Sequence, residues 1–152
     1  MTSFFVAGKP VPQGSKRAIP RQTACGKIHV ALIEMSKGLK GWRAAIKAGA
    51  VAAGLTPLEG PVGMDLTFFM QRPASHHVSG SRERPLKDSA PIYPCGRVGD
   101  LDKLTRAVLD GLDGVAYSDD SQVCMFGKGP IQVYGLKPGV EISVYTMLPG
   151  GV

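Results

Sequence analysis

The stretch GDLDKLTRAVLDGLDGVAYSDDSQV, residues Gly99 to Val123, decides how this chain is interpreted. Its apolar residues recur at helical spacing: Leu101, Leu104, Ala107, Val108 and Leu112. This spacing predicts an amphipathic helix over Leu101 to Gly114. Asp100 stands directly before that helix, where aspartate is a favoured N-cap.

Acidic residues are concentrated in the same stretch. Six of the 12 Asp and Glu residues fall there: Asp100, Asp102, Asp110, Asp113, Asp119 and Asp120. Asp100 and Asp102 are two positions apart, so an extended backbone directs both carboxylates to one side. Asp119 and Asp120 follow one helix later, and the four carboxylates converge if the end of the helix returns beside its start.

A cluster of carboxylates is unfavourable when empty, because each negative charge raises the pKa of its neighbours. A divalent cation relieves the repulsion, and oxygen ligands select the hard ions Mg²⁺ or Mn²⁺ over zinc. The candidate metal ligands are Asp100, Asp102, Asp120 and Asp119.

The same residues also permit a purely structural interpretation. Asp100 then only caps a helix, and Asp119 with Asp120 forms a turn. Arg106 is spaced to form i, i+4 ion pairs with Asp102 and Asp110, each worth about 0.3 to 0.5 kcal/mol. Spacing alone leaves both interpretations open.

Other elements are predicted on either side of this stretch. Strict alternation of apolar residues predicts a half-buried strand over Val62 to Met70, and helical spacing predicts a helix from Met35 to Ala53 that ends at Gly54 in a left-handed conformation. Further strands are expected over Ser3 to Ala7, Gln122 to Phe126, Ile131 to Tyr134 and Val140 to Thr146.

Two segments are predicted to be loops. Residues 9–22 are basic and contain three prolines, which disfavour regular structure. Residues 72–99 form a long basic connection between predicted elements. A structureless connection of that length in a compact domain is usually functional or mobile.

The charge distribution suggests a polyanionic partner. The 152 residues carry a net charge of +6, of which +9 lies in residues 1–99 and −3 in residues 100–152. Candidate DNA contacts are Lys9, Lys16 and Arg17 in the basic loop, Lys40, Arg43 and Lys47 at i, i+3 and i+7 of the first helix, and Lys103 and Arg106. The three helix cations equally suit an ordinary solvated face.

A basic protein with an acidic site for a hard metal fits a phosphodiesterase that acts on nucleic acid, with Lys103 or Arg106 offsetting charge on the phosphate. Other classes find no support. The three cysteines and three histidines lack zinc spacing, no phosphate-binding glycine motif indicates a nucleotide cofactor, and no leader or membrane span is evident. We therefore expect a cytoplasmic protein that has no contact with membranes.

Gly99 to Val123 resembles the RusA family of Holliday junction resolvases, which is frequent in bacteriophages and prophages. The family pattern is roughly D-L-D-N-L-x-K-A-x-x-D-A-L followed by D-D-x-Q-[VI], and the spacing here agrees along the whole run. The basic loop Gly8 to Arg17 and the strand ending FFMQRP match more loosely. The resemblance implies a single RusA-like endonuclease domain over residues 1–152.

The resemblance implies an α+β fold, with a small mixed β-sheet packed against two main helices, in a homodimer. It also implies Mg²⁺ as cofactor and places the catalytic aspartates at Asp100, Asp102 and Asp120, with Asp119 adjacent. Two departures from the family pattern matter: Lys103 replaces an asparagine, and Arg106 replaces a functionally important lysine. Arginine suits a role in clamping phosphate better than one in donating a proton.

The leading hypothesis is a structure-selective endodeoxyribonuclease that resolves Holliday junctions by paired symmetric nicks, leaving 5′-phosphate ends. It would act in DNA recombination and repair, in a bacterium or a phage-infected host cell. A homodimer suits this task because a four-way junction has approximate two-fold symmetry. The alternatives are a non-catalytic protein that binds branched DNA, and a nuclease for forks or flaps.

Overall fold

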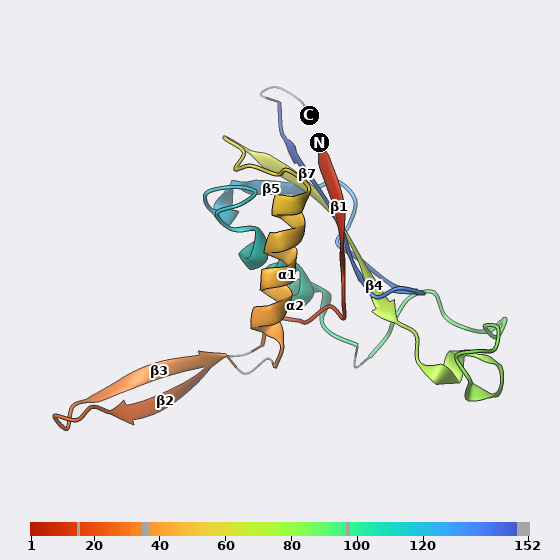
Figure 1. The fold of residues 1–152 in the computed structure, drawn as a ribbon, viewed down its shortest axis with the longest axis horizontal. Coiled ribbons are helices and arrows are strands. Elements are labelled where there is room, and N and C mark those ends of the chain that lie inside the picture. Colours follow the sequence, from red (N-terminus) through yellow and green to blue (C-terminus); the bar gives the residue numbers. More distant parts are fainter. Residues whose placement is uncertain (15, 35–36, 97, 149–152) are drawn as a thin grey trace.

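The computed structural model describes residues 1–14, 16–34, 37–96 and 98–148. Its main strands and helices are β1 (Thr2–Ala7), β2 (Lys16–Gln22), β3 (Ile28–Glu34), α1 (Leu39–Ala52), β4 (Val62–Gln71), α2 (Leu101–Leu112), β5 (Val123–Phe126), β6 (Ile131–Gly135) and β7 (Gly139–Thr146). Short 3-10 helices are η1 (Ala74–His76), η2 (Val78–Gly80) and η3 (Asp120–Gln122). Helices α1 and α2 lie against one face of the main sheet, and the hairpin β2–β3 projects from the body (Figure 1).

The main sheet is mixed. Strands run in the order β1, β7, β4, and both neighbouring pairs are antiparallel. The other edge of β4 is shared by two parallel partners, with β5 beside its first half and β6 beside its second half. The predicted α+β class, with a mixed sheet and two main helices, is confirmed.

Strand β4 is the centre of the sheet and confirms the predicted alternation. Its apolar side chains point to the helices and are at most 2% exposed: Val62, Met64, Leu66, Phe68 and Met70. The intervening Asp65, Thr67 and Phe69 lie on the opposite face and are partly exposed. One face of the sheet therefore supplies the core.

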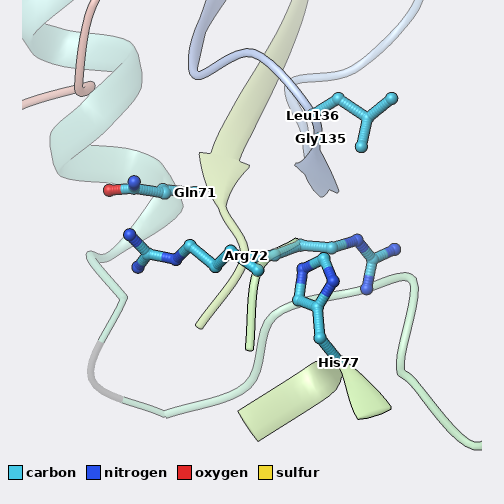
Figure 2. Close-up of a pocket in the computed structure, with 6 residues that line it drawn as sticks. Gln71, Arg72, His77, Gly135 and Leu136 are labelled. Atoms are coloured by element: carbon cyan, nitrogen blue, oxygen red, sulfur yellow. The ribbon is translucent and has the colours of Figure 1, made fainter. Parts of the chain in front are cut away.

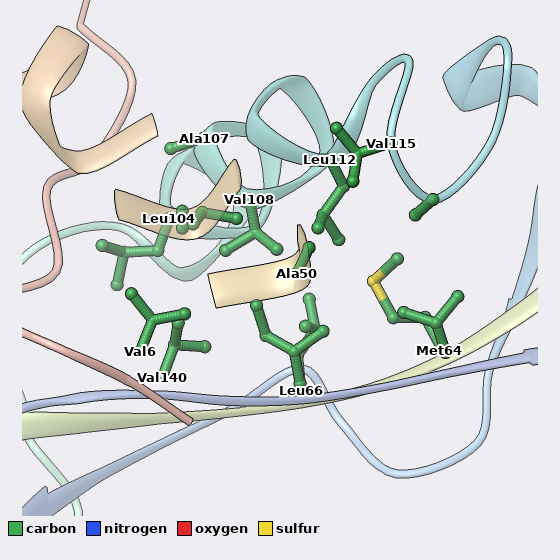
Figure 3. Packing of buried hydrophobic residues seen from close by; sticks show 14 of the residues in the cluster. Val6, Ala50, Met64, Leu66, Leu104, Ala107, Val108, Leu112, Val115 and Val140 are labelled. Atoms are coloured by element: carbon green, nitrogen blue, oxygen red, sulfur yellow. The ribbon is translucent and has the colours of Figure 1, made fainter. Parts of the chain in front are cut away.

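The two helices complete that core. Leu39, Trp42, Ile46 and Ala50 of α1 are buried, as are Leu104, Ala107, Val108 and Leu112 of α2. Figure 3 shows part of this layer, with Val6, Leu66 and Val140 of the strands facing Leu104 and Val108. At Gly111 the helices approach so closely that an added Cβ would lie 3.1 Å from Ile46 Cγ2.

The helix boundaries follow the predictions with small shifts. Gly54 has the expected left-handed conformation (φ +74°), and its N–H and that of Leu55 return to the carbonyls of Val51 and Ala50, which closes α1. The first predicted residues of this helix, 35 and 36, lie outside the described residues. α2 ends at Leu112 because Asp113 leaves helical geometry (ψ 132°).

The prediction that residues 9–22 lack regular structure is wrong for residues 16–22. β2 pairs with β3 in an antiparallel ribbon, in which Pro20 lies opposite Val30. A proline is tolerated there because every strand of a two-stranded ribbon has a free edge. The segment IHVALIE is rich in residues that favour strands, and it provides the partner that the loop prediction overlooked.

Residues 72–99 connect β4 to α2 as expected but are not without structure. They contain η1 and η2, and an isolated bridge joins His77 to Leu86. This loop and the hairpin extend from the body in opposite directions along its longest axis (Figure 1). None of the helices described is long and apolar enough to cross a bilayer.

Candidate active site

The beginning of α2 presents the first two acidic residues of the motif. Asp100 occupies the N-cap position, where its carbonyl accepts the Leu104 N–H, but its side chain caps no backbone N–H. Its carboxylate instead lies 2.8 Å from Lys103 Nζ. This ion pair raises the pKa of Lys103, and both side chains remain largely exposed.

One turn further along, α2 forms the wall of a cavity of about 370 Å³. Its lining residues are Asp102, Thr105, Arg106, Leu109, Asp120 and Pro130. The first four are spaced at i, i+3, i+4 and i+7, so they share one face of the helix. We call this cavity the acidic cleft, because it brings Asp102 and Asp120 together from opposite ends of the motif.

Asp102 and Arg106 also line a second cavity, of about 290 Å³. Gln13, Gly14 and Lys103 complete its lining. The backbone N–H of Gln13 donates to the carbonyl of Lys103 at 3.0 Å, which fixes the segment before the hairpin against α2. The segment that leads to the hairpin therefore lines a cavity that shares Asp102 and Arg106 with the acidic cleft.

Asp119 holds the backbone next to Asp120. It caps η3 by accepting the Ser121 N–H at 2.8 Å, and hydrogen bonding from the side chain and from the backbone N–H of Ser121 lowers the pKa of the Asp119 carboxyl. Gln122 completes a capping box and donates through Nε2 to the carbonyls of Leu58 and Gly60. Asp120 is thus presented from a turn that is tied to the chain entering β4.

Tyr117 lies beneath the same turn. Its side chain is buried, and its hydroxyl donates to the carbonyl of Leu109 at 2.9 Å. Burial raises the pKa of Tyr117, and the negative charges of Asp120, Asp113 and Asp110 raise it further. The buried phenol therefore stays neutral beside the acidic residues.

The predicted convergence of four carboxylates is only partly seen. Asp102 and Asp120 face one cleft, whereas Asp100 turns to Lys103 and Asp119 to Ser121. Among the described residues, no three His, Cys, Asp or Glu side chains are grouped closely enough to hold a metal ion. The donors that line the two cavities nevertheless suit a hard cation. The acidic cleft has the carboxylates of Asp102 and Asp120, and the cavity that Asp102 also lines has Gln13, whose Oε1 is buried and without a hydrogen-bond partner in the described structure.

The predicted basic residues have different positions. Arg106 lies in the cleft, and the described residues include no ion pair from it to Asp102 or Asp110. Asp110 instead binds Arg43 of α1 at 2.6 Å, so that this arginine joins the two helices and is only partly exposed. The exposed cations Lys9, Lys40 and Lys47 remain accessible, while the side chains of Lys16 and Arg17 lie outside the described part of the chain.

Comparison with known proteins identifies the family of the chain. A family model described as Endodeoxyribonuclease RusA matches residues 7–145, which include the whole acidic motif. The chain belongs to the RusA family. It is also similar to the uncharacterized protein YqaN of Bacillus subtilis (strain 168), with 30% identity over 141 residues that cover 93% of each chain.

Membership of the RusA family identifies the chain as a nuclease of the endodeoxyribonuclease class. Five residues of the two cavities were not predicted from the sequence: Gln13, Gly14, Thr105, Leu109 and Pro130. The sequence KPVPQG could have indicated Gln13 and Gly14, because its prolines restrict the backbone that presents these two residues. Thr105 is buried and donates to the carbonyl of Leu101, so its contribution is to the helix wall.

Proposed function

We propose that this RusA-family nuclease resolves four-way DNA junctions by paired, Mg²⁺-dependent nicks that leave 5′-phosphate ends. The observation that carries the proposal is the acidic cleft, a cavity that Asp102 and Asp120 line together with Arg106. Two carboxylates beside a guanidinium suit metal-assisted cleavage of a phosphodiester.

Asp102 and Asp120 would hold the cation, with Asp100 as a third ligand once it leaves Lys103. That exchange is inexpensive, because the Asp100 and Lys103 side chains are 63% and 48% exposed and exposed ion pairs contribute little. The bound ion would supply Lewis-acid polarisation of the phosphate and acidify water next to it. Asp119 would not bind the cation itself and would instead maintain the turn that presents Asp120.

Arg106 would bind the phosphate that is cleaved. A guanidinium can donate two parallel hydrogen bonds to phosphate oxygens, which a lysine at this position cannot do. We expect Arg106→Gln to lower the single-turnover cleavage rate about 10²-fold, or about 2.7 kcal/mol. Arg106→Lys keeps the charge and should stay within about tenfold of the unchanged protein; an Arg106→Gln rate equal to that of the unchanged protein would remove Arg106 from the site.

DNA binding would extend from the cleft along the hairpin. The hairpin follows Gln13, whose backbone is bonded to α2, and it projects away from the body; it carries the exposed Arg21 and Lys27 in addition to Lys16 and Arg17. Contacts of this kind are made to phosphates and weaken with salt. Lys40 and Lys47 of α1 and Lys9 would add further charge.

A homodimer would supply the second active site. Each chain contributes one acidic cleft in the described structure, whereas resolution of a junction requires two cuts at symmetry-related phosphates. The mass of the protein measured by light scattering, alone and with a junction, tests this part of the proposal.

The deciding experiment compares a labelled four-way junction, a fork, a flap and a linear duplex of shared sequence, each with Mg²⁺ and with EDTA. With Mg²⁺ we expect paired, symmetric nicks in the junction, and DNA ligase should reseal the nicked ends without a prior phosphorylation step. With EDTA we expect no cutting. Preferred cutting of forks or flaps would change the substrate class. Binding to the junction without any cleavage would favour a protein that only binds branched DNA.

A further inference from the structure

A third cavity, away from the acidic cleft, lies where β4 and β6 end together. Its volume is about 150 Å³, and its lining residues are Gln71, Arg72, His77, Arg82, Gly135 and Leu136. Gln71 and Arg72 come from the end of β4, Gly135 and Leu136 from the end of β6, and His77 and Arg82 from the 72–99 loop (Figure 2). We call it the cationic pocket, and the cleavage chemistry makes no use of it.

Arg72 is held in place by the loop on one side and by the sheet on the other. Its Nη1 donates to the carbonyl of Pro91 at 2.8 Å, and its guanidinium carbon lies 5.4 Å from the centre of the Tyr134 ring. The Tyr134 N–H in turn donates to the carbonyl of Ile92 at 2.8 Å, and His76 packs edge-on against the Tyr134 ring. These contacts fix the loop to the ends of both strands.

The segment that carries Arg82 is also folded back on itself. His77 Nδ1 lies 2.7 Å from the carbonyl of Arg84, and since a carbonyl only accepts, Nδ1 carries the proton. The N–H groups of Val78 and Lys87 donate to the carbonyls of Pro85 and His76. A loop organised in this way presents Arg82 at low entropic cost, and the ion pairs of the described residues do not involve Arg82.

Strand β6 sets the distance between the cationic pocket and the acidic cleft. Pro130, just before β6, lines the cleft, whereas Gly135 and Leu136 line the pocket. Five residues of a parallel strand span about 16 Å. Because successive phosphates of one DNA strand advance about 3.4 Å along the helix axis, a strand leaving the cleft reaches the pocket within about five nucleotides.

From this geometry we infer that the cationic pocket binds a backbone phosphate of the DNA substrate, at a distance from the bond that is cleaved. Two guanidinium groups and the Gln71 amide match the charge and the hydrogen-bonding capacity of a phosphodiester. The volume is large enough for a phosphate group. The inference rests on the proposed function only in taking DNA as the ligand.

Arg82→Gln tests this inference, and Arg84→Gln is its matched control. Both remove one positive charge from the same exposed loop, but only Arg82 lines the pocket. Binding of a labelled junction is measured by fluorescence anisotropy in EDTA over 50 to 300 mM KCl, so that cleavage is not needed. We expect Arg82→Gln to weaken binding about tenfold and to reduce the slope of log Kd against log salt by about one, with Arg84→Gln within about twofold of the unchanged protein.

Equal effects of the two substitutions on binding and on the salt slope would overturn the inference, because only general charge would then matter. A parallel NMR titration with inorganic phosphate distinguishes the source of the ligand. The inference would also be overturned if phosphate shifted the NMR signals of His77 and Gln71 while Arg82→Gln bound DNA no more weakly than Arg84→Gln. The pocket would then be assigned to a free anion. Failure of the proposed function would show separately, as absence of Mg²⁺-dependent nicking by the unchanged protein.

Discussion

Asp102→Asn is expected to abolish cleavage while leaving junction binding intact. Asp102 is the one acidic residue that lines both cavities beside α2, and it shares the acidic cleft with Asp120. The substitution keeps the shape of the side chain but removes the charge that would hold a cation. Loss of metal-assisted stabilisation should lower the single-turnover cleavage rate at least about 10³-fold, or about 4 kcal/mol.

Junction binding by Asp102→Asn should be unchanged or slightly tighter. Removing a negative charge next to the DNA backbone lowers repulsion, so that Kd measured in EDTA should stay the same or fall by up to about threefold. Cleavage assays in Mg²⁺ and anisotropy in EDTA, made on the same protein sample, separate the two effects.

Asp113→Asn provides the control. Asp113 follows the end of α2, is exposed, and lines neither cavity, yet its substitution changes the net charge equally. It should cleave within about twofold of the unchanged protein. If Asp102→Asn lost junction binding together with cleavage while its circular dichroism and melting temperature were unchanged, the division between binding and catalysis proposed for this cleft would be wrong.

The regular elements of the body were predictable because burial imposes a period on the sequence. Alternation marked β4, and helical spacing marked the buried side of α2, with boundaries displaced by a few residues at most. The hairpin β2–β3 escaped prediction because none of its described side chains belongs to the core, so that burial imposes no clear pattern on them. Ile28 and Val30 of β3 are 72% and 64% exposed.

Contacts across the chain could not be predicted from local patterns. The spacing of Arg106 and Asp110 suggested an ion pair within α2, but Asp110 binds Arg43, 67 residues earlier, because the two helices pack side by side. The meeting of Asp102 with Asp120 likewise depends on the turn that Asp119 and Gln122 tie to the chain before β4. The family resemblance named the acidic residues, and the fold determines which of them face each other.

Phe68→Ala should have the largest effect on stability, because Phe68 is fully buried at the centre of β4. Loss of a buried phenylalanine typically costs about 3 to 5 kcal/mol, which includes the cavity that it leaves. For a chain of this length each kcal/mol lowers the melting temperature by about 2 to 4 °C, so that calorimetry should show a fall of roughly 6 to 20 °C.

The neighbouring Phe69 offers a control of the same size on the other face of the sheet. Phe69 is partly exposed and meets Phe5 at 6.1 Å between ring centres, without a helix above it. Phe69→Ala should therefore cost only about 1 kcal/mol. Equal losses for the two variants would mean that both faces of β4 are covered in the folded protein, and the helices would then account for only one of its two buried surfaces.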